Sequence, residues 1–319
     1  MASVVPWSRR LEQWRPHDDP AAGKGPGRPP IGWERMLRLY CLQPWWGLAD
    51  EALADAVYDS QALRGLLGLD LGRAAVPDAT TLLQFRHLLE TAGLTRTIFA
   101  TINHLWRERG LLMTKGTVVD ATLIAAPPST QNKAQARDPE MGHTRKGQPY
   151  YCGAQAHLGV DAASGLVHRT TTTAAKGADI TATVNLPHGA EVAVLADAGY
   201  TGAEQRAELK DQEVQWYIAT QRGKMAAWPD GRAKALFKHV ERLKAHVRRR
   251  GAHLLHRIKD RCHPRQLRYQ GLKNNGAQHE VLCALAHLII VNKALLAGLR
   301  GHCAHKRGER TMSHPERPK

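Results

Sequence analysis

Apolar and polar positions follow a helical period in the first third of the chain. The predicted helices cover 32–42, 51–58 with Asp50 as N-cap, a segment opened by Pro77-Asp78, and 95–109. Residues 17–30 are rich in Pro and Gly, so no regular element is expected there. The pattern predicts a flexible N-terminal segment over 1–30 and a helical domain over 31–112.

After Gly110 the period becomes extended, and strands alternate with helices. The predicted strands cover 117–119, 154–160, 166–173, 191–196 and 214–219, with a hairpin turn at 161–165 and helices at 179–186 and 203–211. This order fits an α/β fold with a ribonuclease-H-like mixed sheet over 113–300. Residues 301–319 lack apolar periodicity and are expected to form a disordered basic tail.

The total charge alone does not indicate a partner, because many soluble proteins are simply basic; the distribution of charge along the chain says more. The formal net charge is +16, and residues 222–273 contain sixteen Lys and Arg but three acids. A basic block of this kind suits a DNA backbone, whereas the plainer interpretation is a solvated basic helix.

Cysteines and apolar segments indicate a compartment. The five cysteines are scattered without a CxxC pair, which favours a reducing cytoplasm over a disulfide framework or a structural zinc site. The N-terminus shows no apolar core for a signal peptide. Residues 281–299 contain His287, Asn292 and Lys293, so they are interpreted as a packed helix and not as a membrane span, which needs about 20 mostly apolar residues.

Two aspartates each follow a short β-branched or apolar run. Asp120 ends the run that begins at Thr117, and Asp197 ends the run that begins at Val192. Carboxylates at adjacent strand ends can hold divalent metal ions for phosphoryl transfer. Turn chemistry or helix capping explains an aspartate after a strand equally well when it is taken alone.

Several short motifs, in order and at specific spacing, resemble bacterial insertion-sequence transposases of insertion sequence family five, within the DDE superfamily. They are Gly-Arg-Pro-Pro at 27–30, Pro-Asp-Ala-Thr-Thr at 77–81, Gly-Thr-Val-Val-Asp-Ala-Thr at 116–122, Arg-Asp-Pro-Glu-Met at 137–141, His-Leu-Gly-Val-Asp at 157–161, Ala-Asp-Ala-Gly-Tyr at 196–200 and Arg-Tyr-Gln-Gly-Leu at 268–272. The resemblance implies that Asp120 and Asp197 are the first two acids of a triad that binds two Mg²⁺ or Mn²⁺ ions. It also implies double-stranded DNA as partner, at terminal inverted repeats and at target sites, and action as a homo-oligomer.

The third acid of the resembled pattern is missing. Arg248 and Lys259 have the family's spacing around position 252, but that position is alanine. Gly251 and Leu254 also depart from the pattern, while His253 matches it. Glu241 and Asp260 lie about 16 and 12 Å away along a helix, too far to replace the acid without a register shift. The chain is therefore interpreted as an impaired or disarmed transposase; the rival is an active enzyme that recruits Glu140, Asp138 or Glu241.

The remaining candidates each have two readings. Arg248 and Lys259 could contact phosphates or belong to a general basic face. Tyr200 could contact DNA or pack in the core, and His157 is more typical of a core histidine than of a ligand. Cys262 and His263 lack partners at zinc spacing. The N-terminal helices, with Arg64, Arg73, Arg86 and Arg96, could read DNA ends or mediate dimerisation.

Three functions follow from these residues. The first is a transposase that cleaves and joins DNA. The second is a catalytically inactive DNA-binding remnant, able to occupy terminal repeats or to poison a mixed oligomer. The third and weakest is a nuclease that uses two acids and leaves cut but unjoined DNA. Position 252 separates the first two.

Overall fold

The computed structural model describes residues 31–112, 115–128, 130, 136–145, 148–177, 179–209, 213–262 and 266–310, with the backbone alone at 222, 250–262 and 292–310. The predicted flexible segment 1–30, with its motif at 27–30, and His263 lie outside the described residues. Within these ranges no helix combines the length and apolar content needed to cross a membrane.

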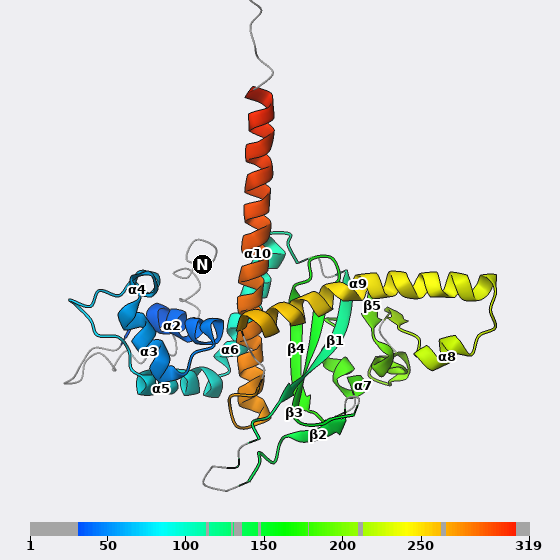
Figure 1. The fold of residues 1–319 in the computed structure, drawn as a ribbon, viewed down its shortest axis with the longest axis horizontal. Coiled ribbons are helices and arrows are strands. Elements are labelled where there is room, and N and C mark those ends of the chain that lie inside the picture. Colours follow the sequence, from blue (N-terminus) through cyan, green and yellow to red (C-terminus); the bar gives the residue numbers. More distant parts are fainter. Residues whose placement is uncertain are drawn as a thin grey trace, which may run out of the picture.

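The first third of the described chain is helical, as the apolar period predicted (Figure 1). Its helices are α2 (Trp33–Trp46), α3 (Asp50–Asp59), α4 (Gln61–Leu67), α5 (Ala79–Thr91) and α6 (Leu94–Glu108). Asp78 caps α5 by accepting a hydrogen bond from the Thr81 amide at 2.7 Å, which confirms the predicted start. The pattern missed α4, because this two-turn helix buries only Leu67 and offers almost no apolar period.

One large core joins this helical domain to the rest of the chain. Trp106 and Leu89 are fully buried in it, and the same cluster includes Val118 and Leu158 of the sheet and Leu285 of the last helix. Apolar burial is the main favourable term in folding. The helical domain is thus packed against the sheet domain over a shared apolar interior.

The described strands form one six-stranded mixed sheet. They are β1 (Gly116–Ala125), β2 (Gly142–Arg145), β3 (Tyr150–Asp161), β4 (Val167–Ala174), β5 (Ala193–Ala196) and β6 (Gln215–Ile218). β3 pairs antiparallel with β1 and β4, whereas β5 is parallel to β1 and β6 to β5. The order β4-β3-β1-β5-β6, with β2 beside the start of β3, is that of a ribonuclease-H-like sheet. The predicted fold class is confirmed.

β1 is much longer than the predicted strand at 117–119. It runs from Gly116 to Ala125, so Asp120 lies within the strand and not at its end, which corrects the prediction. The cause is β3, which pairs with β1 from Thr117 to Ala125. β5 pairs with β1 only as far as Val118, so Asp120 lies where β1 extends beyond its parallel neighbour.

Short elements fill the connections between strands. They are α7 (Asp179–Ala182), η2 (Thr183–Asn185), η3 (Ala198–Tyr200), η4 (Ala203–Gln205) and α8 (Arg222–Ala226). Of the helix predicted over 203–211, residues 206–209 are not helical, and residues 210 and 211 lie outside the described part. Arg206 adopts an extended backbone, with φ −69° and ψ 138°, and this ends η4.

Two long helices complete the described chain. α9 (Arg232–Cys262) packs against β1 and β5 and projects beyond the sheet, while α10 (Leu272–Arg310) packs against α6 and β4 (Figure 1). α9 contains no proline and a single glycine, at 251, so nothing interrupts its hydrogen-bond ladder. The bounds of α10 reach Arg310, whereas no regular element was expected from His302 onward; residues 311–319 lie outside the described part.

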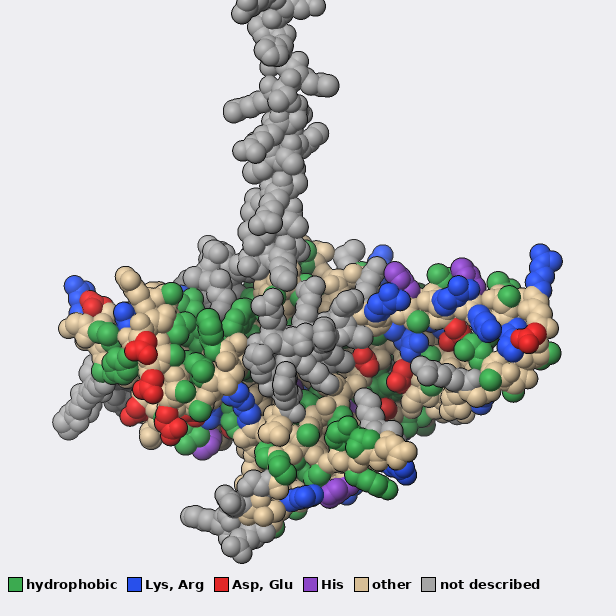
Figure 2. All heavy atoms as spheres, viewed as in Figure 1, with side chains coloured by type: hydrophobic (Ala, Val, Ile, Leu, Met, Phe, Trp, Pro, Cys, Tyr) green, Lys and Arg blue, Asp and Glu red, His purple; other side chains and the backbone are tan. Residues whose placement is uncertain are grey.

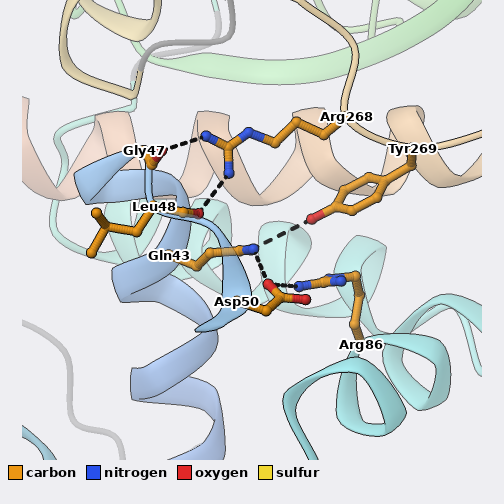
Figure 3. A network of polar contacts seen from close by, with 7 residues as sticks. All are labelled: Gln43, Gly47, Leu48, Asp50, Arg86, Arg268 and Tyr269. Carbon is orange, nitrogen blue, oxygen red and sulfur yellow. Dashed lines mark hydrogen bonds and ion pairs between the residues drawn. The ribbon is translucent and has the colours of Figure 1, made fainter. Parts of the chain in front are cut away.

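Residues 268–272, which we call the clasp, lie at the end of the connection between α9 and α10. They contact the helical domain (Figure 3). Arg268 donates to the carbonyl oxygens of Gly47 and Leu48 at 2.9 and 3.0 Å. Arg86 lies over the ring of Tyr269, with its guanidinium carbon 5.0 Å from the ring centroid. This part of the clasp therefore holds the N-terminal helices in place.

The second half of the clasp begins α10. The Gly271 amide donates to Asp138 Oδ2 and the Leu272 amide to Glu140 Oε2, both at 2.6 Å. Carboxylates at a helix start satisfy amides that have no partner within the helix. The motif at 137–141 and the motif at 268–272 are thus two halves of one contact.

Candidate functional site

The parallel pairing of β1 and β5 brings Asp120 and Asp197 together. Val118 of β1 is the register partner of Leu195 of β5, and each aspartate lies two residues further along its own strand direction. Asp197 is the first residue after β5 and is exposed, while Asp120 is half-buried. The two predicted acids therefore occupy neighbouring positions that solvent can reach.

Local hydrogen bonds orient both carboxylates. Asp197 Oδ1 accepts from the Gly199 amide at 2.9 Å and caps η3, and Asp120 Oδ1 accepts from the Ala121 amide at 2.9 Å. Capping was the alternative explanation for such an aspartate, and Asp197 does cap a short helix. Capping does not exclude a second partner, since each carboxylate accepts several bonds.

Tyr200 and His157 are buried residues close in the chain or in the sheet to these acids. Tyr200 ends the short helix that Asp197 caps, and His157 is the register partner of Ala121, next to Asp120. Tyr200 is completely buried among Val119 and Leu186, so its burial favours the packing role over the predicted contact with DNA. Its hydroxyl lies 3.5 Å from His157 Nδ1, and His157 Nε2 lies 2.8 Å from Thr173 Oγ1. Burial lowers the pKa of His157 to about 4, so this imidazole is neutral at neutral pH. His157 is a core histidine, as predicted.

A third aspartate reaches the same place, and the sequence pattern did not single it out. Asp179 begins α7, and its Oδ1 lies 4.0 Å from His157 Nδ1. A Cβ added to Gly199 would lie 3.0 Å from Asp179 Oδ2 and 3.1 Å from Asp197 Oδ1. Both carboxylates therefore flank the same backbone position.

The donors at this site suit hard divalent cations. Asp120, Asp179 and Asp197 offer carboxylate oxygens, the ligands that Mg²⁺ and Mn²⁺ prefer in proteins. Half-buried and exposed positions leave room for the water molecules that Mg²⁺ retains. The residues present thus fit a divalent-cation site.

Position 252 lies on α9, the helix that packs against β1 and β5. Its alanine and Lys259 lie in the stretch described by backbone alone, so their side chains are not placed. Arg248 is half-buried, and its Nε has no hydrogen-bond partner among the described residues. The helix of the expected third acid therefore crosses the right strands, with a methyl group in place of a carboxylate.

The acids considered as replacements have other partners. Asp138 and Glu140 bind the start of α10. Burial opposes ionisation of Glu241, but hydrogen bonds from Lys244 and Thr220 outweigh it and lower the pKa. The side chain of Asp260 is not among those described. None of the three described acids lies at the Asp120–Asp197 pair as a spare carboxylate.

A separate group of possible metal ligands lies near the start of β1. His168, His188 and Glu191 each place one ligand atom within 4.8 Å of the others. Glu191 already accepts from the His188 and Gly189 amides at 2.6 and 2.7 Å and from the Thr117 hydroxyl at 3.0 Å. A carboxylate saturated in this way serves the fold. Thr117 lies three residues before Asp120, about 10 Å along the strand.

A basic surface extends from the site along the projecting helices. We call α8 and α9 the basic arm; its exposed cations include Lys224, Arg232, Lys238, Arg242 and Arg249. Figure 2 shows Lys and Arg side chains along this projection and acidic ones over the helical domain. Asp230 and Glu241 of the arm are paired with Lys234 and Lys244, each at 2.9 Å.

The chain is similar to known proteins in two comparisons, one with protein-family models and one with solved structures. The family model described as Transposase DDE domain matches residues 112–289, and a second model, described as Transposase domain, matches residues 1–88. Among solved structures, the Mos1 mariner paired-end complex with Mn is 13% identical, with 85% of this chain and 86% of that chain covered and a TM-score of 0.20. The Mos1 strand transfer complex is 14% identical, covers 80% and 84%, and has a TM-score of 0.18. These scores are too low to support an argument.

A ribonuclease-H-like sheet with two acids near the ends of adjacent strands is compatible with the class of proteins that transfer phosphoryl groups in nucleic acids. The match over more than half of the chain makes the assignment specific: the chain belongs to the family of transposases with a DDE domain. DNA transposition, by DNA phosphoryl transfer with divalent metal ions, is the activity of that family.

Proposed function

We propose that this chain is the transposase of an insertion sequence of family five, and that it acts as a homo-oligomer on double-stranded DNA. Its reaction is metal-dependent cleavage at terminal inverted repeats, followed by joining to target DNA. The chemistry of this copy is reduced, because Ala252 stands where the third acid belongs. The match to the transposase family supports the general activity, and the motif pattern supports the narrower assignment.

The observation that carries the proposal is the register of β1 and β5. Asp120, within β1, and Asp197, the first residue after β5, each lie two residues beyond the last register pair, Val118 and Leu195. Rigid strands hold such side chains more reproducibly than loops do. Two carboxylates so held can position a pair of Mg²⁺ or Mn²⁺ ions, which when bound supply an activated nucleophile and stabilise the leaving oxygen.

The chain's own residues then have distinct roles. Asp120 and Asp197 hold the cations at the open edge of the sheet, and Tyr200 with His157 fills the space beneath them and excludes water from that side. Arg248 and Lys259 flank position 252 on α9, where they contact DNA phosphates in the proposed complex. The basic arm extends this contact along the duplex.

A joining assay on DNA with the cognate ends, in Mg²⁺ and in Mn²⁺, tests the proposal by comparing this chain with Ala252→Glu. We expect the glutamate to raise the rate about 100-fold or more, since each 1.4 kcal/mol of transition-state stabilisation is about a factor of ten. The matched control is the double variant Ala252→Glu, Asp197→Asn, which should be inactive.

Equal activity of the two proteins would show that position 252 is not the third acid. No activity in either protein, with specific binding to the element ends retained, would favour the alternative of a catalytically inactive DNA-binding remnant. Cleaved but unjoined DNA would favour the nuclease reading.

A further inference from the structure

The fold brings Asp179 to the proposed cation site, and this acid lies on α7 and not on α9. It lies 18 residues before Asp197 in the sequence, yet the two carboxylates meet over Gly199. Asp179 Oδ2 lies 3.0 Å, and Asp197 Oδ1 3.1 Å, from the point where a Cβ of residue 199 would lie. A Cβ at position 199 would therefore contact both carboxylates.

The charge around Tyr200 gives the same picture for all three acids. Burial is the largest cause that raises the pKa of the Tyr200 hydroxyl, and the negative charges of Asp179, Asp197 and Asp120 raise it further. Charges act on one buried hydroxyl in this way only when they lie near it. All three carboxylates therefore lie within electrostatic reach of the Tyr200 hydroxyl.

A buried histidine lies beside Asp179. His157 is fully buried, and its Nδ1 lies 4.0 Å from Asp179 Oδ1. Carboxylate oxygens are the ligands that Mg²⁺ and Mn²⁺ prefer in proteins.

We propose that Asp179 is a third carboxylate ligand of the divalent-cation site and keeps that site competent to bind cations although position 252 is alanine. The inference rests on the proposed function, since it assumes the cation pair at Asp120 and Asp197. Asp179 is half-buried on the first turn of α7, the helix that follows β4 in the sequence. It therefore supplies a ligand from a different element than the one that carries position 252.

Direct measurement of Mn²⁺ binding tests this without relying on catalysis. The full-length protein is titrated with Mn²⁺, and free Mn²⁺ is followed by electron paramagnetic resonance. The variants are Asp179→Asn, Asp120→Asn and Asp197→Asn, with Asp55→Asn on exposed α3 as the matched control. Asparagine can also begin a helix, so α7 should be preserved. Circular dichroism checks the fold of each variant, and Asp179→Ser replaces any asparagine variant that does not fold.

We expect Asp179→Asn to weaken Mn²⁺ binding at least about tenfold, as a lost ligand should cost no less than a lost outer-shell partner. Asp55→Asn should bind like the wild type. Adding Ala252→Glu to Asp179→Asn should restore most of the lost affinity, because α9 then supplies the third acid.

Each contrary result has a separate meaning. Wild-type affinity in Asp179→Asn, with weak binding in Asp197→Asn, overturns the role of Asp179 and leaves the proposed function intact. Wild-type affinity in both Asp120→Asn and Asp197→Asn overturns the cation pair itself. A wild-type protein that binds no Mn²⁺ overturns the present inference, and the joining assay on Ala252→Glu then decides the proposed function.

Discussion

The helical domain and the basic arm both contain many arginines but use them differently. Residues 31–112 hold eight arginines, no lysine and nine acids, while residues 222–262, which span the arm, hold eight arginines, five lysines and three acids. In the helical domain, Arg35, Arg38 and Arg64 donate to backbone carbonyl oxygens nearby. In the arm, several cations are exposed (Figure 2). The partners of the guanidinium groups, more than their number, distinguish a structural region from a DNA-binding one.

The largest expected effect contrasts the two regions on DNA. The triple variant Lys238→Ala, Arg242→Ala, Arg249→Ala should weaken binding to a labelled duplex about 100-fold or more. The salt slope, which is the slope of the logarithm of the binding constant against the logarithm of the salt concentration, should become smaller in magnitude by about three. Fluorescence anisotropy over a range of salt concentrations measures both quantities.

The matched control for that variant removes exposed arginines of the helical domain, namely Arg73→Ala, Arg96→Ala and Arg109→Ala. Its salt slope should stay close to that of the wild type. If the helical-domain variant lost more affinity than the arm variant, the N-terminal helices would be the DNA-end readers and the contrast would be reversed.

A smaller effect, on stability, should follow from Arg86→Ala. Arg86 is 4% exposed and donates to Asp50 Oδ1 at 2.7 Å, so its removal leaves a partly buried carboxylate without its cation (Figure 3). We expect the free energy of unfolding to fall by about 3 kcal/mol, measured by urea denaturation followed by circular dichroism. Arg249→Ala on the exposed arm should change it by less than about 0.5 kcal/mol. Similar values for both variants would remove the distinction between structural and surface arginines.

The effect with the narrowest range of conditions appears only at acidic pH and concerns the packing of α10 on β4. Burial lowers the pKa of His279 to about 4 and that of His287 to about 3, both from an ordinary value of 6.5. Below pH 6.5 the unfolded chain binds protons that the folded chain does not. The free energy of unfolding is therefore unaffected by these two histidines above pH 6.5. As the pH falls towards 4, it decreases by about 1.4 kcal/mol per pH unit for each histidine.

His279→Gln is the variant that checks this pH dependence, because glutamine can keep a bond to the Thr172 hydroxyl, which lies 3.0 Å from His279 Nδ1. Urea unfolding at a series of pH values gives the free energy of unfolding as a function of pH. Its slope should be smaller in the variant, by the equivalent of about one proton. An unchanged slope between pH 6 and about 5 would mean that His279 is protonated in the folded protein.

Local chemistry made part of the fold predictable. The cap at Asp78 depends on one side chain and the amide three residues later. The hairpin turn at 161–165 likewise depends on Asp161, which accepts from the Ser164 amide at 2.8 Å, and on Gly165, whose φ is 73°. Such signals lie within a few residues, so the sequence alone reveals them.

Other features depend on partners distant in sequence and could not be predicted. The length of β1 is set by β3, more than 25 residues downstream. The meeting of Asp179 with Asp197 depends on how α7 and η3 pack, and the burial of Tyr200 depends on the same packing. The candidate acids Asp120 and Asp197 were predicted because a motif marks them, whereas Asp179 stands at a site no local pattern marks.

The clasp has a consequence for how the protein is made. Translation delivers the helical domain first, but Arg268 and Tyr269, which hold its helices, leave the ribosome after four fifths of the chain. Until then the N-terminal helices lack these contacts. A product truncated before residue 268 would contain Asp120 and Asp197 but could not make these contacts, so assembly of the complete protein waits for nearly full-length synthesis.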